Sequence, residues 1–452
     1  METQQAFAPL ARTYFLPTEV YNPLMRTAAS LAAAGYSNVT AIIEQAGPNA
    51  GFSALDDLDP QTRQLVEDTL QETWVEYFHE FFRNLTESDP RPQVVSFSVR
   101  VVAAVLEILG SRILTDDARA LQWNIDYENL TLVPLSVFED GLRNLTLNEG
   151  ITILVASGDA GASAPQDAPC FPASDPLVAN HVSNSWPQVS PWVTTVGGTQ
   201  FLATEESPQE EVVVSYETYG GVTSGGGFAG PAYPQDLFSM PAWQKKAVSR
   251  YLSENNETSF PGFPTNITPG YNPSGRAYPD IAMYGSGWPL LTSEGTVLRQ
   301  VGTSLAAPMA AAMFSLANQK LLEDGYEVIG YANPMLYWMG ENCSEAFNDI
   351  TLGNNMAGDL TADNCLFGFP AARGWDATTG FGSIRFEPFV ACAKRYQNEV
   401  RGKGLEILPD GTYREAAGVP STSPPSDSVS ATIPVSWLAL VAQFVLFGGL
   451  HF

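Results

Sequence analysis

The run ITILVASGDAG at residues 151–161 decides the fold class. Its first six residues are all apolar or β-branched, which is typical of a short strand buried on both faces of a parallel sheet. A helical pattern at residues 138–148 comes before it, and another apolar run, QVVSFSV, occupies residues 93–99. Strand, helix and strand in this order form a βαβ unit. The sequence therefore predicts an α/β fold, with a doubly wound parallel sheet and flanking helices.

The run GTSLAAP at residues 302–308 carries the strongest chemical signal. It opens a helix of small residues and places the Ser304 hydroxyl at the helix N-terminus, where backbone N–H groups and the helix dipole favour developing negative charge. The alternative is a serine that only caps the helix. Capping alone requires neither Gly302 before the serine nor Pro308 after it. We therefore expect Ser304 to be a nucleophile.

A nucleophilic serine needs a base, and the composition favours a carboxylate. The chain has three histidines, and none stands in a setting typical of a Ser-His-Asp triad. Asp and Glu number 49 against 22 Lys and Arg, which gives a formal net charge of −27. This balance argues against nucleic acid as a partner. It fits work at acid pH, where carboxylates act as acids and bases, although a solvated acidic surface would show the same charge.

Together these features resemble the sedolisin family of serine-carboxyl peptidases, which includes tripeptidyl peptidases. The turn SGDAG at residues 157–161 is similar to the family's turn that bears the oxyanion-stabilising acid, and this assigns that role to Asp159. A carboxyl group that is protonated at low pH can donate a hydrogen bond to a tetrahedral oxyanion. Three more landmarks follow in the family's order, namely SPWVTTVGGT at 190–199, SGGGF at 224–228 and GRAYPDIA at 275–282. The resemblance implies a subtilisin-like fold.

Two later segments resemble the family's calcium-binding loops. They are FNDITLG at residues 347–353 and GWDATTGFG at residues 374–382. By this resemblance five residues would hold one structural Ca²⁺: Asp349 and Asp376 through their side chains, and Ile350, Ala372 and Gly374 through their carbonyl oxygens. Hard cations of this kind prefer several oxygen ligands. Two Asx-turns punctuated by glycine are the alternative.

One expected feature of the family is not found. In relatives a Glu-x-x-x-Asp pair on one helix supplies the base and its orienting acid, because that spacing puts both carboxyl groups on one face. No such pair occurs before Ser96. The nearest candidates are Glu72, Glu76 and Glu80, which lie too close to the strand at 93–99, and Asp56, which has Phe52 in the place of the glutamate. Two readings follow: a truncated or misassembled sequence of an active enzyme, or an inactive relative.

Several features indicate the secretory pathway. The four cysteines are too dispersed for a metal site and allow two disulfides or buried free thiols. Seven asparagines head glycosylation sequons. No signal peptide is recognisable, so we expect the true N-terminus to lie upstream. The cysteines are Cys170, Cys343, Cys365 and Cys392, and the sequons begin at Asn38, Asn84, Asn129, Asn144, Asn256, Asn266 and Asn342.

The chain is predicted to divide into one peptidase domain and a tether. The domain occupies residues 1–400, with a possible insertion at 100–135. A Ser/Pro-rich spacer at 401–430 leads to an apolar tail at 431–452. The tail resembles a GPI-attachment signal, with a transmembrane helix as the rival. We therefore expect a membrane-attached protein at the cell surface or in an acidic, lysosome-like or vacuole-like compartment.

The predicted reaction is hydrolysis of peptide bonds at acid pH through an acyl-enzyme on Ser304. Whether the protein trims tripeptides or cuts internally stays open. The alternative from another class is an inactive, calcium-stabilised surface protein that binds peptides. A lipase-like hydrolase is a distant third, because the chain has no Gly-x-Ser-x-Gly elbow.

Overall fold

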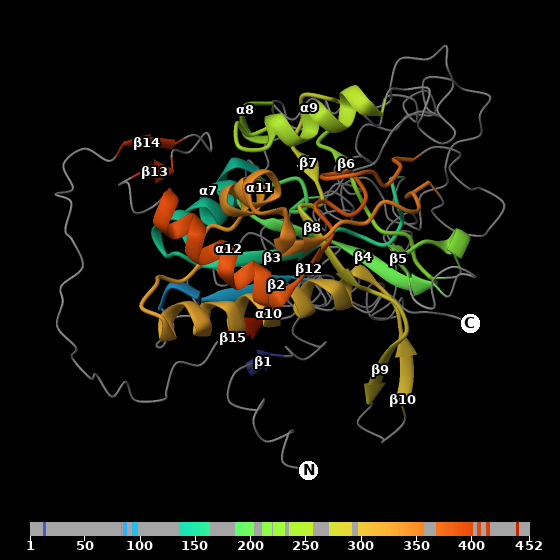
Figure 1. Ribbon diagram of the computed structural model, residues 1–452, viewed down its shortest axis with the longest axis horizontal. Helices are drawn as coiled ribbons and strands as arrows, with labels where there is room; N and C mark the ends of the chain where they lie inside the picture. The colour runs from blue at the N-terminus through green and yellow to red at the C-terminus, as the bar shows by residue number, and fades with distance from the viewer. Residues whose placement is uncertain are drawn as a thin grey trace, which may run out of the picture.

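The fold is described from a computed structural model. It describes residues 12–14, 83, 85–87, 93–97, 135–162, 186–202, 210–218, 220–230, 235–255, 271–291, 297–356, 368–400, 405–407, 413–415 and 440–442. Within these ranges a sheet of seven strands lies at the centre, with helices on both sides of it (Figure 1). The α/β class predicted from residues 93–161 is confirmed.

Five strands of the central sheet are parallel neighbours. They lie in the order β12 (Ser383–Ile384), β8 (Ile281–Tyr284), β4 (Thr194–Leu202), β3 (Thr152–Ala156) and β2 (Val94–Phe97). Two antiparallel strands complete the sheet: β11 (Phe347–Asn348) beside β12, and β5 (Glu210–Val213) beside the far end of β4. The described parallel strands follow chain order without reversing. The reversal that defines a doubly wound sheet is therefore not among them and stays a prediction.

The helices cover the sheet at different places. The helix expected at 138–148 is α7 (Leu135–Arg143) with a π-helical continuation (Asn144–Asn148), and it leads directly into β3. Helix α10 (Thr303–Glu323) contacts β2, β3, β4 and β8. In the view of Figure 1 it lies below the central strands, whereas α9 (Lys245–Glu254) and α11 (Asn333–Asn342) lie above them. Helix α12 (Phe386–Glu399) packs against α10 and α11.

The core is densest where α10 meets the sheet. Ala306, Ala307, Ala310 and Ala311 on this helix are completely buried. Small side chains let the helix backbone approach the strands closely, which leaves little room for the helix to move. Strands β3 and β4 are buried as well, apart from the end of β4. This packing fixes the position of the first turn of α10, which carries Ser304.

The remaining elements are short. Helix α8 (Gln235–Phe238) precedes α9, and two 3₁₀ turns lie at Tyr216–Thr218 and Ser344–Ala346. Strand β6 (Gly227–Phe228) pairs with β7 (Ala277–Tyr278), and the hairpin of β9 (Trp288–Leu291) and β10 (Val297–Gln300) leads into α10. The other pairs are β13 (Leu405–Ile407) with β14 (Tyr413–Glu415), and β1 (Arg12–Tyr14) with β15 (Leu440–Ala442).

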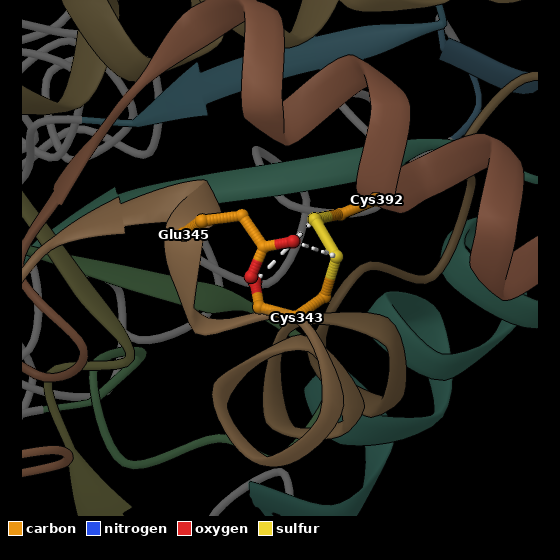
Figure 2. A group of neighbouring side chains, drawn as sticks. All are labelled: Cys343, Glu345 and Cys392. Atoms are coloured by element: carbon orange, nitrogen blue, oxygen red, sulfur yellow. Dashed lines mark hydrogen bonds between the residues drawn. A yellow bond between two sulfur atoms is a disulfide. The ribbon is translucent and has the colours of Figure 1, made fainter.

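A disulfide joins the end of α11 to α12. It links Cys343 to Cys392, which settles the open question for these two cysteines, whereas Cys170 and Cys365 lie outside the described residues. The carboxylate of Glu345 lies 3.4 Å from the Cys343 sulfur (Figure 2). The three residues resemble a metal-binding group, but both sulfurs are consumed by the disulfide and neither can act as a thiolate ligand.

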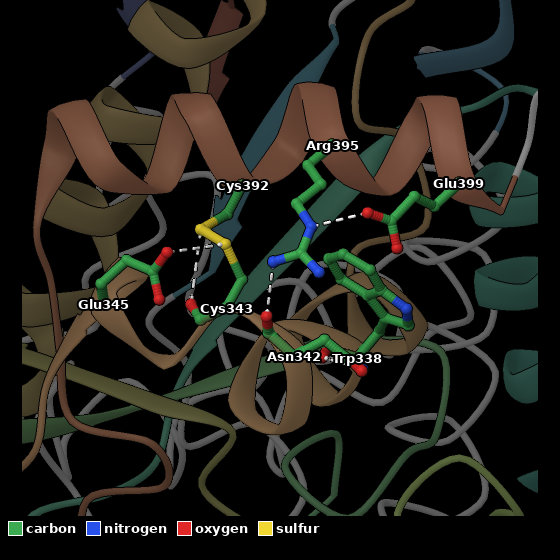
Figure 3. Close-up of a disulfide and its surroundings, with 7 residues drawn as sticks. All are labelled: Trp338, Asn342, Cys343, Glu345, Cys392, Arg395 and Glu399. Carbon is green, nitrogen blue, oxygen red and sulfur yellow. Dashed lines mark hydrogen bonds and ion pairs between the residues drawn. A yellow bond between two sulfur atoms is a disulfide. The ribbon is translucent and has the colours of Figure 1, made fainter.

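Arg395 of α12 stacks on α11 next to this disulfide. The Arg395 guanidinium lies 5.4 Å from the ring centre of Trp338 and donates a 2.7 Å hydrogen bond to the Asn342 carbonyl (Figure 3). Its Nε atom also pairs with Glu399 at 2.6 Å. The end of α11 is thus held to α12 by the disulfide, the cation–π contact and the hydrogen bond to Asn342, whereas the ion pair with Glu399 lies within α12.

Several sequence-based expectations fall outside this description. The possible insertion, most of the spacer and most of the apolar tail lie outside the described residues, as do the candidate bases Glu72, Glu76, Glu80 and Asp56. Among the helices that the structure does describe, none combines the length and the apolar character needed to cross a bilayer.

Candidate active site

Ser304 lies at the carboxyl edge of the sheet. It is the second residue of α10, and the glycine before the helix, Gly302, has a φ of +140°. The Gly302 N–H donates a 2.8 Å hydrogen bond to the carbonyl of Gly285, directly after β8. Ser304 is half-buried. The helix therefore begins where ligands bind in open α/β sheets, at the ends of the parallel strands.

Asp159 comes to the same place from a different strand. It follows the end of β3, and its Oδ1 atom accepts hydrogen bonds from the Thr303 N–H at 2.7 Å and the Thr303 hydroxyl at 2.8 Å. The Thr303 hydroxyl in turn accepts a 3.1 Å bond from the Gly158 N–H. The structure thus brings together Asp159 and Ser304, the two residues predicted from sequence to be catalytic. The link is Thr303, which bonds Asp159 and directly precedes Ser304.

The hydrogen bonds indicate which Asp159 oxygen would carry a proton. Both bonds from Thr303 end on Oδ1, so a proton on that atom would meet two donors. The protonated carboxyl group would therefore carry its hydrogen on Oδ2. A Cβ atom added to Gly302 would lie 3.2 Å from this Oδ2 atom. Glycine at position 302 therefore adopts the required φ and adds no Cβ atom that would crowd this oxygen.

The SGGGF loop lies alongside the Asp159 turn. The Thr223 N–H donates to the Asp159 carbonyl at 2.9 Å, and the Gly225 N–H donates to the Gly158 carbonyl at 2.8 Å. A Cβ atom on Gly225 would lie only 2.2 Å from the Ser157 carbonyl oxygen. Glycine at this position therefore allows the loop to approach the backbone of the Asp159 turn closely.

A buried carboxyl group lies nearby in the chain but has other partners. Glu139 of α7 accepts hydrogen bonds from the Trp186 ring N–H at 2.6 Å and the Ser190 hydroxyl at 3.0 Å. Burial raises the pKa of Glu139 from 4.5 to about 7, against the lowering effect of these two bonds. It anchors the loop before β4 to α7, and its hydrogen bonds involve neither Ser304 nor Asp159.

The residues predicted to bind calcium are also brought together. The Asp349 Oδ2 atom accepts a 2.9 Å bond from the Gly374 N–H, and the Asp376 Oδ2 atom accepts a 3.1 Å bond from the Ala372 N–H. Both carboxylates therefore contact one three-residue stretch of backbone. Ile350, whose carbonyl completes the predicted ligand set, directly follows Asp349 and is buried.

The chemistry of Asp376 fits a cation site. Its side chain is completely buried, and burial raises its pKa to about 7, although N–H groups of Ala372, Thr378 and Thr379 donate hydrogen bonds to it. In the part of the chain that the structure describes, no Lys or Arg forms an ion pair with it. A buried carboxylate needs a compensating charge to stay ionised. Burial also raises the pKa of Asp349. A hard cation between the two loops would supply that charge.

Comparisons with known proteins identify relatives over half of this chain. No family model matches it. Physarolisin of Physarum polycephalum is 31% identical over 260 residues, which are 54% of this chain and 41% of that protein. Tripeptidyl-peptidase 1 of Bos taurus is 33% identical over 243 residues, covering 52% and 36%. Over about half of its length the chain is thus similar to peptidases of the sedolisin family. Tripeptidyl-peptidase sed1 of Aspergillus fumigatus is a similar sedolisin relative, 32% identical over 253 residues, covering 53% and 35%.

The match to these sedolisins is partial. The chain spans only 35% to 41% of the length of the three relatives. A solved structure, Pseudomonas sedolisin complexed with pseudo-iodotyrostatin, aligns over 74% of this chain and 70% of that one, with 20% identity and a TM-score of 0.45. At this level of similarity the fold assignment rests on the chain's own sheet, described above.

The sequence analysis missed one residue of this candidate site. Thr303 connects Asp159 to the first turn of α10, yet only its neighbours were singled out. The signal was present in the GTS run, because a threonine at the start of a helix often uses its hydroxyl for a local hydrogen bond. What the sequence does not contain is the partner, which lies 144 residues away.

Proposed function

We propose that this protein is a serine-carboxyl peptidase, which hydrolyses peptide bonds at acid pH through an acyl-enzyme on Ser304. The observation that carries the proposal is the pair of hydrogen bonds that fixes Asp159 to Thr303, beside the serine. The named relatives are peptidases of the same family. The doubly wound, subtilisin-like topology expected for the whole chain is part of this proposal.

The chemistry assigns a separate task to each residue. The Ser304 hydroxyl attacks the scissile carbonyl carbon and passes its proton to a carboxylate base, which the sequence does not identify. The resulting oxyanion accepts a hydrogen bond from the Asp159 Oδ2–H group, which stabilises the transition state more than the substrate. The intermediate then expels the amine, which takes up the proton. Water hydrolyses the Ser304 ester in a second round of the same steps.

One structural Ca²⁺ is part of the proposal. Asp349 and Asp376 would bind it through their carboxylates, and Ile350, Ala372 and Gly374 through their carbonyl oxygens. The ion would compensate the charge of the buried Asp376 and hold the two loops together.

The compartment is proposed on independent grounds. A disulfide such as that of Cys343 and Cys392 persists in an oxidising environment. Asn144 and Asn342, which head two of the sequons, are exposed. We infer that the protein is glycosylated and works in the secretory pathway, at the cell surface or in an acidic compartment. Attachment to a membrane through residues 431–452 remains part of this proposal.

The deciding experiment compares wild type with Ser304→Ala on a peptide library from pH 3 to pH 7. We expect acid-optimal cleavage that is lost in the variant. Ser249→Ala, at an exposed serine of α9, is the control and should retain activity. Cleavage that persists in Ser304→Ala would contradict the assignment of the nucleophile.

A second function is favoured by one observation, the absence of a Glu-x-x-x-Asp pair before Ser96. Without a base the same site would bind peptides and not cleave them. Peptide binding that saturates without turnover at any pH, in a protein that unfolds cooperatively, would support this reading.

A further inference from the structure

A buried asparagine joins the Asp159 turn to the Asp376 loop. Asn355 lies at the end of the segment 351–356 and is completely buried. Its backbone N–H donates to the Phe369 carbonyl at 3.1 Å, and the Phe369 N–H donates to its Oδ1 atom at 2.7 Å. The side-chain oxygen is therefore used in pairing two segments of the chain, and the amide nitrogen is directed elsewhere.

The backbone of Asn355 supports the turn that carries Asp159. The Ala162 N–H donates a 2.9 Å hydrogen bond to the Asn355 carbonyl. Gly161 packs against the same carbonyl so closely that an added Cβ atom would lie 2.3 Å from the oxygen. The end of the Asp159 turn thus rests directly on Asn355.

The side-chain amide reaches two other loops. Its Nδ2 atom donates to the Ala377 carbonyl at 3.3 Å and to the Gly226 carbonyl at 3.4 Å. These bonds are longer than the usual ~2.9 Å, but together they use both hydrogens of the amide. Ala377 follows Asp376, and Gly226 belongs to the loop that lies beside Asp159. Ser224 of that loop also donates to the Thr378 carbonyl, at 2.9 Å.

We propose that Asn355 is a positioning residue, which holds the turn of Asp159 against the loop of Asp376 and so sets where the Asp159 carboxyl group stands. Asparagine is the side chain that meets the requirement, because it offers one acceptor for Phe369 and two donors for two carbonyls. The consequence for catalysis rests on the proposed function. The structural part of the proposal is independent of that function, because it concerns only how firmly the Asp159 turn is held in place.

The test uses Asn355→Asp in the whole protein, with Asn333→Asp as the matched control. Asn333 is equally buried and accepts a 2.7 Å bond from the Thr194 hydroxyl while donating one to the Val193 carbonyl at 2.7 Å. These partners lie at the start of β4, at the opposite edge of the sheet from Asp159. Each substitution exchanges one amide for a carboxyl group at a buried site, so both variants share the general cost of such a change.

The first readout is hydrogen exchange of the Gly161 and Ala162 amides, measured under conditions where all three proteins are folded. We expect exchange to be about ten-fold faster or more in Asn355→Asp, because a lost local hydrogen bond lowers the free energy of local opening. Exchange there should be unchanged in Asn333→Asp. Equal protection in Asn355→Asp and wild type would overturn the proposal, and so would equal loss of protection in both variants.

The second readout is peptide cleavage per folded molecule as a function of pH. We expect kcat of Asn355→Asp to fall by about ten- to a hundred-fold with little change in KM, because the displaced group acts in the transition state. The introduced carboxyl group would still donate one bond while it is protonated, so the loss should deepen as the pH rises. Asn333→Asp should keep the wild-type pH profile. A wild-type protein that cleaves no peptide would contradict the proposed function alone, and the exchange measurement would still decide the role of Asn355.

Discussion

Thr303 is the residue on which the geometry of the site depends most directly. Its hydroxyl accepts from the Gly158 N–H and donates to Asp159, so it connects two consecutive residues of the turn after β3 to α10. Its backbone N–H adds a second bond to the same carboxylate oxygen. The orientation of the Asp159 carboxyl group is therefore fixed by a residue that itself does no chemistry.

Replacing Thr303 by valine tests this arrangement. The variant keeps the shape of the side chain and loses the hydroxyl, so kcat should fall about ten-fold as Asp159 loses one of its two orienting bonds. Thr152→Val is the control, because its equally buried hydroxyl bonds the Gly330 carbonyl at the other end of β3. An equal loss of kcat in both variants would show that Thr303 has no special role.

An alanine at position 302 would have two effects, backbone strain from the positive φ and crowding of Asp159, and a second glycine allows them to be separated. Gly302→Ala combines a φ of +140° with a Cβ atom 3.2 Å from Asp159 Oδ2. Gly325→Ala has a φ of +79° and nothing within 4 Å of its added Cβ atom. Both should lower the free energy of unfolding by roughly 1 to 3 kcal/mol, as measured by denaturant titration. Only Gly302→Ala should also lower kcat at full folding, and unchanged cleavage by this variant would contradict the crowding argument.

At the scale of single elements, α7 and the loop before β4 are coupled through Glu139. Its folded pKa of about 7 lies above the ordinary value of 4.5, so the folded state binds the proton more tightly than the unfolded chain. The stability that results is fully present below pH 4.5 and is lost as the pH rises towards 7. This element is thus most stable in acid, in agreement with the proposed compartment.

The variant Glu139→Gln should remove this dependence. Across pH 4.5 to pH 7 the free energy of unfolding of wild type should fall by roughly 3 kcal/mol more than that of the variant. The exposed neighbour Asp140 gives the control, Asp140→Asn, which should follow wild type. Parallel stability curves for wild type and Glu139→Gln would contradict the assignment of a raised pKa.

The disulfide between α11 and α12 has a stabilising effect of calculable size. It closes a loop with a sequence separation of 49 residues, for which the chain-entropy model gives about 4 kcal/mol. A double variant, Cys343→Ser with Cys392→Ser, should lose stability of this order in denaturant titration. Wild type kept under reducing conditions should lose at least as much stability as the double variant, and a smaller loss would indicate that the serines themselves destabilise the protein.

At the scale of the whole molecule, the two cation loops join segments that are distant in the chain. Chelation should lower the melting temperature of wild type, because the buried Asp376 then loses its compensating charge. Asp376→Asn should melt at the same temperature with and without added Ca²⁺. Asp140→Asn keeps both loops and should respond to chelator like wild type. A wild-type melting temperature that is independent of chelator would contradict the calcium assignment.

The sequence predicts those features that depend on neighbouring residues, and it does not predict contacts between residues that are far apart in the chain. The strand at 152–156 and the helix that carries Ser304 follow from local patterns, and both are confirmed. The pairing of Cys343 with Cys392, the role of Thr303 and the contacts of Asn355 depend on strand register and loop packing, and no local pattern contains that information. Asp159 was identified through the resemblance to a known family. The reason for the orientation of its carboxyl group came from the structure.

The disulfide of α11 also sets an order of events during synthesis. Asn342, Cys343 and Ser344 are consecutive, so one tripeptide is both a sequon and half of a crosslink. Cys392 leaves the ribosome 49 residues after Cys343, which at ordinary elongation rates is a delay of roughly 2 to 10 s. If Asn342 is glycosylated as proposed, an oligosaccharyltransferase would reach its sequon before Cys392 is available to close the bridge, and a shorter interval would lower glycan occupancy.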